Sequence, residues 1–537
     1  MKKGGVCLIY PPLSVHEFPH LALPLLKSYL VSHGVRDVVV KDFNVGMMNQ
    51  IISLGFDKVE KYFTLNNIKL TASEVEKNFD RARHILKEPR EKGKDEWAFR
   101  LLNTYIKIAG SGISDFCFSP SSFNEIKERF DLDAVDQESG YVMEDIRNRI
   151  IPNICEESPQ IVGISIPFAS QIYYSLAIGR ELKRRLPGIR IVLGGPQVSL
   201  FRNLIAGHPT FREAYDALIC GQGEKPLLKY VTSVRNGEDL GNVPNLTYYD
   251  DKQGRILQTP EASSPDVNEL AVPDFSDLPL DQYVYPKLPY FLSRGCYWAR
   301  CAFCSYRDTN GYGRREIDKI ASDLAVMKRD HHNRFFHFID DAIHPEQTRE
   351  IAERLIHENL YIKYESYLRL DRRFTAELCE LLARSGMRSA LFGFESGNER
   401  ILKLMNKGIH LPQAVQVLKN MKAAGVYSVL SCLIGFPSET EEEAKESLRF
   451  LKTNKEWYDQ AFLVHYGLIS DMFNNKDKYS ISSISLDNPV RYDDTGFLAL
   501  GYEYTTNTGM SVEQALSVIK YGREYLGIQT FEDCFFS

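Results

Sequence analysis

Three of the ten cysteines lie within one short segment just past the middle of the 537-residue chain. They are Cys296, Cys301 and Cys304, whereas the other seven cysteines are scattered singly. Three thiolates on one loop can bind a metal ion or an iron–sulfur cluster. A closed zinc site usually takes four ligands, and neither a second cysteine pair nor a spaced histidine pair stands nearby. We therefore interpret the segment as a site for a four-iron cluster that keeps one iron open, with zinc or a chance grouping as the alternatives.

Charged side chains stand at the ends of the next two predicted strands. Asp340 and Asp341 follow a strand expected over 335–339. Adjacent carboxylates repel each other, so a bound cation or ammonium group would explain them, and a role at a helix N-terminus is the alternative. Arg369 ends the following strand and could bind a carboxylate through two hydrogen bonds, although an ion pair with Asp371 would explain it equally well.

The first half of the chain alternates between strands and helices. Strands that are apolar on both faces and separated by helices predict a doubly wound parallel sheet, which binds ligands beyond the carboxyl ends of its strands. A charged, helix-rich stretch over about 45–157 interrupts this pattern, and we expect a helical insertion because a structureless loop of that length is unusual. Its role as a substrate contact, an oligomer contact or a decoration is left open. The expected strands are 5–10, 37–41, 161–166, 189–193 and 217–220, with helices over 21–33 and 171–185.

A second run of strands and helices follows a linker that is rich in proline and aspartate. Six strand–helix units in a row favour a partial (β/α)6 barrel, with chemistry at the carboxyl ends of its strands. The overall class is therefore α/β. We expect domains at 1–250 and 290–468, a linker over 251–289 and a small C-terminal region over 469–537. The expected strands of the barrel are 290–293, 335–339, 364–369, 390–394, 427–434 and 462–466, with helices over 345–357 and 439–451.

Composition limits the class of protein. With 44% hydrophobic and 25% charged residues, the chain is typical of a soluble globular protein. The net charge of −6, without a basic stripe, argues against nucleic-acid binding. Neither a signal peptide nor the ~18 uninterrupted apolar residues of a membrane span is recognisable. The scattered cysteines suit a reducing cytoplasm rather than a disulfide framework.

The cysteine segment resembles the cluster loop of the radical S-adenosylmethionine (SAM) superfamily. In that family, three cysteines after the first barrel strand hold a [4Fe–4S] cluster, and SAM binds its unique iron. The usual spacing is C-x-x-x-C-x-x-C, and this chain has one extra residue between the first two cysteines. The segments G-F-E-S at 393–396 and G-F-P-S-E-T at 435–440 match family segments after the fourth and fifth strands.

The resemblance implies a set of SAM-binding residues at successive strand ends. Phe303, in the family's C-x-aromatic-C form, would lie against adenine, and Arg369 would pair with the SAM carboxylate. Asp340 and Asp341 would receive the amino group, while the later segments would contact the ribose and adenosine. The implied set is Phe303, Asp340, Asp341, Arg369, Glu395, Ser396, Gly435, Phe436 and Pro437. The cluster ligands would be Cys296, Cys301 and Cys304, and the catalytic residues are left unassigned.

Four loops of the first half resemble those of the cobalamin-binding domain that precedes many radical SAM barrels. Their glycines let the backbone approach a large ring, and their Ser and Gln side chains offer hydrogen bonds. A D-x-H-x-x-G motif, whose histidine would ligate cobalt, is absent, as in some subgroups of the family. A degenerate domain without cobalamin is the alternative. The implied residues are Tyr10, Pro11, Ser165, Phe168, Ser170, Gln171, Gly194, Gly195, Pro196, Gln197, Gly223 and Glu224.

The resemblance as a whole implies a cobalamin-dependent radical SAM enzyme. A 5′-deoxyadenosyl radical would take hydrogen from an unactivated carbon, and methylcobalamin would then deliver a methyl group, which makes a C-methyltransferase the expected activity. A rearrangement, cyclisation or ring contraction is the alternative among enzymes, and a ligand sensor or a zinc scaffold is the alternative outside them. The expected partners are an electron donor such as flavodoxin or ferredoxin and a small-molecule or peptide substrate, with neither nucleic acid nor membrane.

Overall fold

The structure is a computed structural model. It describes residues 4–14, 18–65, 67–87, 92–109, 122–132, 141–262, 266–304, 311–468, 481–491 and 500–527. Parts of the expected insertion and of the expected C-terminal region therefore lie outside the described residues. The chain forms two compact units: 1–83, 99–286 and 487–500 make the first, and 84–98, 287–486 and 501–537 make the second. The expected insertion is thus divided between the two units.

The first unit is built on a seven-stranded sheet in the order β2-β1-β3-β4-β5-β6-β7. The strands β1 to β5 run parallel, and β6 and β7 add an antiparallel hairpin at one edge, which the sequence analysis missed. All five residues of β1 and of β3 are buried, as strands covered on both faces require. The bounds are β1 Val6–Tyr10, β2 Val38–Asp42, β3 Ile161–Ser165, β4 Arg190–Gly194, β5 Ala217–Ile219, β6 Leu246–Asp250 and β7 Arg255–Gln258.

The strand order of this sheet reverses between β1 and β3. The chain moves from β1 to β2 on one side of β1, and then through β3, β4 and β5 on the other side. Helices α1 and α11 contact each other, while α8 contacts α5 and α7, so the helices form two groups. A reversal of this kind opens a crevice at the carboxyl ends of the two central strands, where doubly wound sheets bind ligands. The bounds are α1 Ala22–Ser32, α8 Gln171–Arg185, α9 Pro196–Leu200, α10 Arg202–Gly207 and α11 Glu224–Asn236.

The stretch between β2 and β3 is helical, as expected. Its described residues contain no strand, and a single π-turn, Ile146–Ile150, joins its last two helices. The apolar residues of α2 that recur at helical spacing, such as Ile51, Val59 and Phe63, are buried. The bounds are α2 Phe43–Leu65, α3 Ala72–Lys87, α4 Lys92–Ala109, α5 Phe123–Leu132, α6 Tyr141–Asp145 and α7 Ile151–Glu156.

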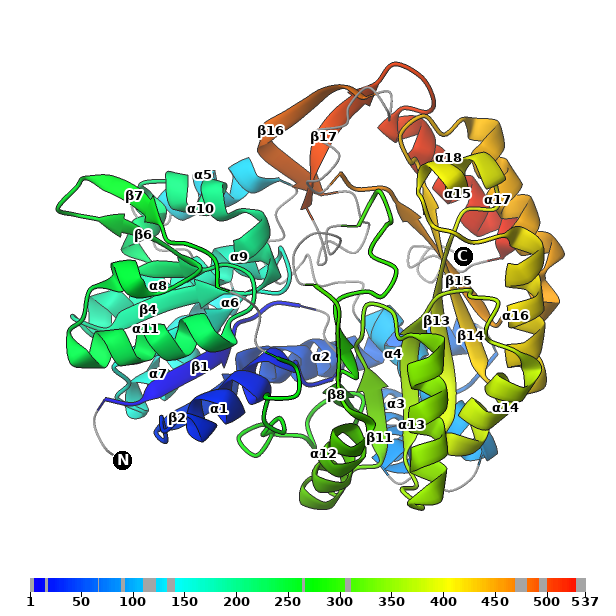
Figure 1. Ribbon diagram of the computed structural model, residues 1–537, viewed down its shortest axis with the longest axis horizontal. Coiled ribbons are helices and arrows are strands. Elements are labelled where there is room, and N and C mark those ends of the chain that lie inside the picture. Colours follow the sequence, from blue (N-terminus) through cyan, green and yellow to red (C-terminus); the bar gives the residue numbers. More distant parts are fainter. Residues whose placement is uncertain are drawn as a thin grey trace. The chain divides into compact units, whose positions relative to one another are not determined.

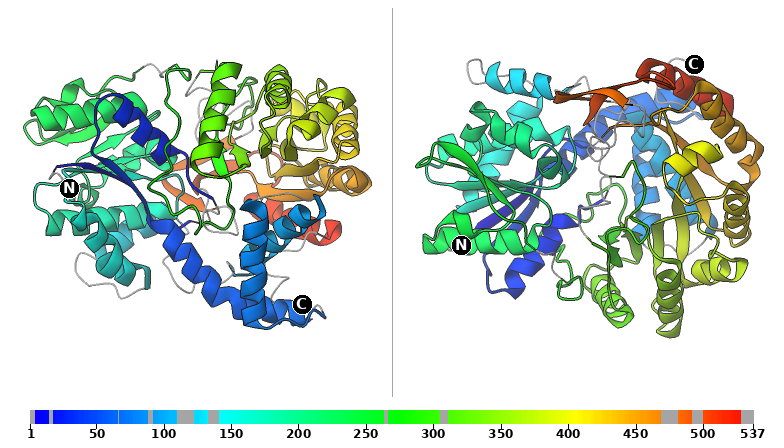
Figure 2. Two further views of the ribbon diagram at one scale, coloured as in Figure 1. Left: turned by 90° about the horizontal axis from the view of Figure 1, so that it is seen from below. Right: turned by 45° about the horizontal axis from the view of Figure 1, so that its top comes forward.

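The second unit is built on six parallel strands in the order β15-β14-β13-β12-β11-β8. Each strand is followed by a helix or a loop that returns to the next strand, which gives the open (β/α)6 barrel that the sequence predicts, with helices along one face (Figure 1, Figure 2). The strands are β8 Leu288–Tyr290, β11 Phe335–Phe338, β12 Lys363–Leu368, β13 Met387–Glu395, β14 Tyr427–Ile434 and β15 Gln460–His465. The helices are α12 Ile317–Asp330, α13 Pro345–His357, α14 Ala376–Ser385, α15 Glu399–Leu404, α16 Leu411–Ala423 and α17 Glu441–Thr453.

Alternate residues of these strands point to opposite faces of the sheet. The hydroxyl groups of Tyr364 on β12 and Ser385 on α14 lie 2.8 Å apart, and the ring of Phe394 on β13 stacks on Phe450 of α17. These residues therefore mark the outer face, which packs on the helices. We call the opposite face the inner face. On β15 it presents Phe462, whose exposed fraction is 38%, between the buried Ala461 and Leu463.

The C-terminal region contributes a two-stranded ribbon and one helix. The strands are β16 Ile481–Arg491 and β17 Leu500–Thr506, and α18 Val512–Leu526 follows them. A capping box formed by Ser511 and Gln514 starts α18, which packs on α17 and β15. A Cβ on Gly522 would lie 2.7 Å from side-chain atoms of both Leu448 and Leu463, so a larger residue there would require these leucines to move. Among the described residues, no helix is both long enough and apolar enough to cross a membrane.

Candidate functional site

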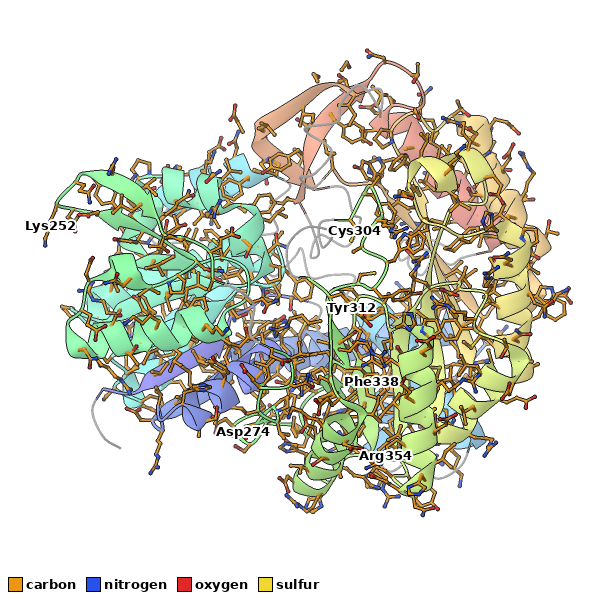
Figure 3. The ribbon with its side chains drawn as sticks, in the orientation of Figure 1. Lys252, Asp274, Cys304, Tyr312, Phe338 and Arg354 are labelled. Atoms are coloured by element: carbon orange, nitrogen blue, oxygen red, sulfur yellow. The ribbon has the colours of Figure 1, made fainter. Side chains whose placement is uncertain are left out.

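The three clustered cysteines lie on the loop that follows the first strand of the second sheet. After β8, the short strand β9 (Ser293–Arg294) pairs with β10 (Gly313–Arg314), and the cysteines lie between them. Cys301 is buried, while Cys296 and Cys304 are half-buried; Cys304 and Tyr312 are labelled in Figure 3. Gly295, with a φ of +76°, has room for no side chain, because a Cβ there would lie 2.3 Å from the carbonyl oxygen of Gly311. The two ends of the loop are thus held together at a position that requires glycine.

The extra residue between the first two cysteines is accommodated by a local turn. Ala299 adopts a positive φ of 43°, which is uncommon for a residue with a side chain. Beside it, Trp298 donates a hydrogen bond from Nε1 to the carbonyl oxygen of Asn406 at 2.8 Å. Ala302 donates its backbone N–H to the carbonyl oxygen of Met405, also at 2.8 Å. The loop is therefore attached at two points to the segment that follows α15.

Two cations lie beside the thiol of Cys301. Burial raises the pKa of Cys301, and the positive charges of Lys407 and Arg369 act in the opposite direction, favouring the thiolate. In the described part of the chain, no group of three or more His, Cys, Asp or Glu side chains is arranged as a metal site. The loop nevertheless supplies three soft sulfur donors next to positive charge, a donor set that suits an anionic iron–sulfur cluster.

Asp340 and Asp341 occupy different surroundings. The carboxylate of Asp340 is buried and accepts hydrogen bonds from the backbone N–H of Leu292 at 2.9 Å and from the hydroxyl of Ser293 at 2.7 Å. Burial raises the pKa of Asp340 to about 7, although these hydrogen bonds lower it. Asp341 is exposed, and the helix that follows is capped by His344 rather than by either aspartate. Asp340 thus braces the turn before the cysteine loop, and the helix-cap alternative does not hold.

Arg369 is buried and lies against the cysteine loop. Its guanidinium carbon is 3.9 Å from the centroid of the Trp298 ring, and Nη2 donates a hydrogen bond to the carbonyl oxygen of Lys407. Its Nε and Nη1 have no hydrogen-bond partner in the described structure. Asp371 pairs instead with Arg373 at 2.7 Å, so the alternative of an Arg369–Asp371 ion pair is not what the structure contains. A buried guanidinium with two unsatisfied N–H groups can bind a carboxylate in the bidentate geometry that arginine favours.

The segment after the fourth strand combines an ion pair with a link to a helix. Glu395 adopts a φ of 67° and pairs with the buried Lys407 at 2.8 Å, and Lys407 Nζ lies 5.4 Å from the centroid of the Phe303 ring. The hydroxyl of Ser396 lies 3.1 Å from that of Ser447 on α17. Glu395 and Phe303 thus both contact Lys407, a residue that the sequence analysis did not identify. The hydroxyl of Ser396, in contrast, faces the helix α17.

The segment after the fifth strand is a tight turn. Gly435 has a φ of +88° and donates its N–H to Oε2 of Glu439 at 2.6 Å. The carbonyl oxygen of Gly435 accepts a hydrogen bond from Tyr504 Oη at 2.9 Å. Phe436 packs edge to face on Tyr466. The C-terminal region, which carries no chemical signal in the sequence, therefore supports this turn through Tyr504.

The candidate loops of the first unit gather at the carboxyl ends of β1, β3, β4 and β5. Tyr10 ends β1 and Ser165 ends β3, so both lie at the point where the strand order reverses. Gly194 pairs with Ser165 in the sheet, and Gly223 precedes α11, whose first residue, Glu224, is buried. The structure thus brings the four loops to one edge of the sheet.

The polar side chains of these loops bind neighbouring backbone. Gln171 Nε2 donates to the carbonyl oxygen of Pro11 and Ser170 Oγ to that of Leu13, both at 2.7 Å. Gln197 Nε2 donates to the carbonyl oxygen of Pro167 at 3.2 Å. Tyr10 Oη lies 3.0 Å from the hydroxyl of Ser14, Phe168 is half-buried, and Pro196 starts α9.

At Gly195 the backbone of one loop comes very close to the backbone of a neighbouring loop at Ile166. Its φ is +103°, and a Cβ would lie 2.8 Å from the backbone nitrogen of Ile166. The edge is therefore held by side chains that bridge loops, together with a glycine that lets the backbone of its loop lie directly against Ile166.

Comparisons with known proteins match both halves of the chain. Residues 290–451 match the radical SAM superfamily. The chain is 27% identical over 339 residues to an uncharacterized methyltransferase of Pyrococcus horikoshii, covering 61% of this chain and 71% of that protein. It is 26% identical over 311 residues to the anaerobic magnesium-protoporphyrin IX monomethyl ester cyclase of Rubrivivax gelatinosus, covering 55% of this chain and 54% of that protein.

Two solved structures share the fold. OxsB, a cobalamin-dependent S-adenosylmethionine radical enzyme with aqua-cobalamin and S-adenosylmethionine bound, superposes with a TM-score of 0.57 at 16% identity, over 84% of this chain and 52% of OxsB. The radical S-adenosylmethionine methyltransferase TsrM from Kitasatospora setae superposes with a TM-score of 0.55 at 17% identity, over 86% of this chain and 75% of TsrM. At these identities, the likeness establishes the fold. The α/β class with a doubly wound first domain and a partial barrel is confirmed.

Proposed function

We propose that this radical SAM enzyme, whose domain of that superfamily spans residues 290–451, is a cobalamin-dependent C-methyltransferase. The substrate carbon would be unactivated, and the substrate itself a small molecule or a peptide. When bound, the cluster supplies the electron that cleaves SAM, and cobalamin supplies the methyl group. The electron donor is proposed to be a flavodoxin or a ferredoxin.

The observation that carries the proposal is that a loop with three cysteines lies next to a buried arginine whose guanidinium has unsatisfied N–H groups. Cys296, Cys301 and Cys304 would hold the cluster, and Arg369 lies against the same loop through Trp298. Its two unsatisfied N–H groups suit the carboxylate of SAM. Asp341, exposed at the end of β11, remains the candidate for the amino group of SAM, because Asp340 is engaged by backbone.

Around that core, the other SAM candidates take different roles. Phe303, next to Lys407, would lie against the adenine, and the Gly435 turn would let the adenosine approach the backbone. Glu395 keeps Lys407 charged and fixed. Ser396 is assigned to positioning the strand end, because its hydroxyl faces Ser447.

Cobalamin is proposed for the reversal point of the first sheet. Gly194 would let the backbone approach the corrin ring, while Gly195, packed on the backbone of Ile166, and the bridging Gln171 and Gln197 would keep the loops in place. In addition, two structures with the same fold, OxsB and TsrM, hold cobalamin. The protein would contribute loop shape here rather than a cobalt ligand.

The test is reconstitution of the full-length protein without oxygen, with iron, sulfide and hydroxocobalamin. We expect a broad iron–sulfur absorption and corrinoid bands, with the iron–sulfur absorption lost in Cys301→Ala and retained in the control Cys155→Ala. Cys155 is a half-buried free thiol outside the loop, so the control removes a thiol but no ligand. A wild-type protein that binds no iron would contradict the proposal at its core, and one that binds iron but no corrinoid would remove cobalamin from it.

A cyclisation is the second candidate, because magnesium-protoporphyrin IX monomethyl ester cyclases are among the relatives. The two reactions consume SAM differently. Methyl transfer uses one SAM for the radical and a second to remethylate cobalamin, so S-adenosylhomocysteine forms alongside 5′-deoxyadenosine. A cyclisation yields 5′-deoxyadenosine alone. Quantifying both products in the reconstituted enzyme distinguishes the two candidates.

A further inference from the structure

The inner face of β12 carries an unbroken row of polar side chains. Lys363, Glu365 and Tyr367 alternate with the helix-facing residues of the strand, and Arg369 follows directly after its last residue. Lys363 forms an ion pair with Asp95 of α4 at one end, and Arg369 lies against the cysteine loop at the other. At ~3.3 Å per residue, Tyr367 stands about 6.6 Å along the strand from Arg369. The phenol is thus one step away from the proposed SAM carboxylate site.

Between these ends, four side chains form a connected chain. Lys287 Nζ lies 2.5 Å from Oε1 of Glu365, and the same oxygen contacts Nδ1 of His337 on β11. The other ring nitrogen of His337, Nε2, lies 3.3 Å from Tyr367 Oη. His337 and Glu365 are direct neighbours in the sheet register, so the contact is built into the strand pairing.

The charges in this chain follow from burial and proximity. Burial opposes ionisation of Glu365, but Lys287 and His337 outweigh it and lower the pKa of Glu365 to about 2. Burial lowers the pKa of His337, with Glu365 raising it and Lys287 lowering it further. Glu365 is therefore a carboxylate, and His337 is neutral near pH 7. Because Nδ1 of His337 contacts Glu365, the tautomer of the neutral imidazole that carries its proton on Nδ1 leaves Nε2 as an acceptor for the phenol hydrogen.

We propose that Tyr367 is a catalytic base for a protic group of the substrate, with His337 and Glu365 as its positioning residues. The inference rests on the proposed function of the same domain. The phenol oxygen accepts the proton of a substrate O–H or N–H while its own proton passes to Nε2 of His337. One X–H bond and one phenol O–H bond break, one new O–H bond and one N–H bond form, and Glu365 stabilises the resulting imidazolium. Electrons are neither gained nor lost.

The rest of the inner face indicates the kind of molecule that brings this group. Lys287 is paired with Glu365 and Lys363 with Asp95, and Arg369 is assigned to the carboxylate of SAM, so a neutral protic group fits better at Tyr367 than an ion. On β15, the inner face presents Phe462 and Val464, with exposed fractions of 38% and 42%. An apolar body with one hydroxyl, amide or similar group is therefore the substrate class that we infer.

The test uses 4-nitrophenol, which combines an aromatic body with one acidic hydroxyl and changes colour when it ionises. The full-length protein is titrated with the probe at a pH just below the probe's own pKa, and the difference absorbance reports the bound phenolate. We expect saturable binding with ionisation. The ratio of bound phenolate to bound phenol should fall about tenfold or more in Tyr367→Phe and His337→Asn, the change that one pKa unit represents. Tyr361→Phe is the matched control, because Tyr361 is 70% exposed.

Glu365→Gln tests whether Glu365 acts on the proton transfer, because a purely structural role would not change the pH at which the bound probe ionises. Without the carboxylate, the imidazolium is less stable, so ionisation of the bound probe should require a higher pH. A wild-type protein that binds the probe as the neutral phenol, or not at all, overturns the inference. So does an unchanged signal in variants that retain wild-type circular dichroism. The measurement needs neither cluster nor cobalamin, so its failure leaves the proposed function standing, and a failed reconstitution leaves this inference standing.

Discussion

The strand ends of the two units differ in how completely their polar groups are satisfied. In the first unit, Gln171, Ser170 and Gln197 all donate to backbone carbonyl oxygens of neighbouring loops. In the second unit, the described structure leaves two N–H groups of the buried Arg369 without a partner. The polar side chains of the first edge thus serve mainly to bridge its own loops, whereas Arg369 keeps two N–H groups that an anionic group can bind.

This difference teaches what each edge can offer to a ligand. An edge whose side chains bridge its own loops offers a large molecule a fixed shape rather than free polar groups. The edge that contains Arg369 can hold a negatively charged group, because two buried N–H groups of its guanidinium gain partners only when that group binds. Substitutions in the first unit should therefore lower stability, and substitutions at Arg369 should lower affinity.

The largest effect is expected for Arg369→Met. Two charge-assisted hydrogen bonds to a carboxylate contribute about 3 to 6 kcal/mol together, so the Kd for SAM should rise roughly 100-fold or more. The thermal midpoint of the ligand-free protein should fall only slightly, because methionine loses the hydrogen bond to Lys407 and the stacking on Trp298 but no longer buries two unpaired N–H groups. Equilibrium binding of SAM to the reconstituted protein, paired with a thermal melt, measures both quantities.

The control for this prediction is Arg373→Met. Arg373 is more exposed and pairs with Asp371, and an exposed pair contributes about 0 to 1 kcal/mol. SAM affinity close to wild type is expected for that variant. Equal losses of affinity in both variants would contradict the assignment of Arg369 to the carboxylate of SAM.

Buried acids give the second unit a pH dependence. Burial raises the pKa of Glu439 from its ordinary 4.5 to about 8, so the folded protein keeps a proton that the unfolded chain has lost. Between these two pH values the folded state binds more protons, and stability falls as the pH rises. The free energy of unfolding should therefore decline from about pH 5 to about pH 8, by at most about 1.4 kcal/mol per pH unit from this group. Glu439→Gln should flatten that decline.

Denaturant unfolding at several pH values measures this slope. Glu441→Gln is the matched control, because Glu441 is exposed and pairs with Lys445 on the surface of α17. It should leave the slope unchanged. A slope of the same steepness in Glu439→Gln would show that other buried acids, such as Asp340, dominate the pH dependence.

The order of elements and the thiol loop could be predicted from the sequence because both depend on local patterns. The bounds of β14, α8 and α13 agree with the expected ones, since each has a clear apolar period and a sharp start. The hairpin of β6 and β7 was missed because its short strands are partly exposed and carry polar residues. Local sequence patterns thus predict those helices and strands that have one strongly buried face.

Contacts between distant residues could not be predicted in the same way. Lys407 pairs with Glu395, and Tyr504 supports Gly435 from 69 residues away, yet neither residue stands in a recognisable motif. Asp340 accepts hydrogen bonds from the backbone N–H of Leu292 and from the hydroxyl of Ser293, which a sequence pattern does not reveal, and its expected contact with SAM stays a prediction. The sequence predicted the strand β12, but it did not indicate that His337 of the neighbouring strand contacts Tyr367.

The smallest effect is expected in the first unit, for Gln171→Leu. The side chain of Gln171 is fully buried and donates to the carbonyl oxygen of Pro11, while Oε1 accepts from the N–H of Phe168 at 3.2 Å. Leucine would leave both backbone groups buried without a partner, which destabilises the protein by about 1 to 3 kcal/mol. Urea unfolding measures this loss, and Gln416→Leu, at an exposed glutamine of α16, should change stability by less than about 0.5 kcal/mol. Corrinoid binding by the folded Gln171→Leu protein should weaken only slightly, because Gln171 is expected to hold the loops in place and not to contact the corrinoid. A complete loss of corrinoid binding at unchanged stability would instead make Gln171 a ligand-binding residue and remove the contrast between the two edges.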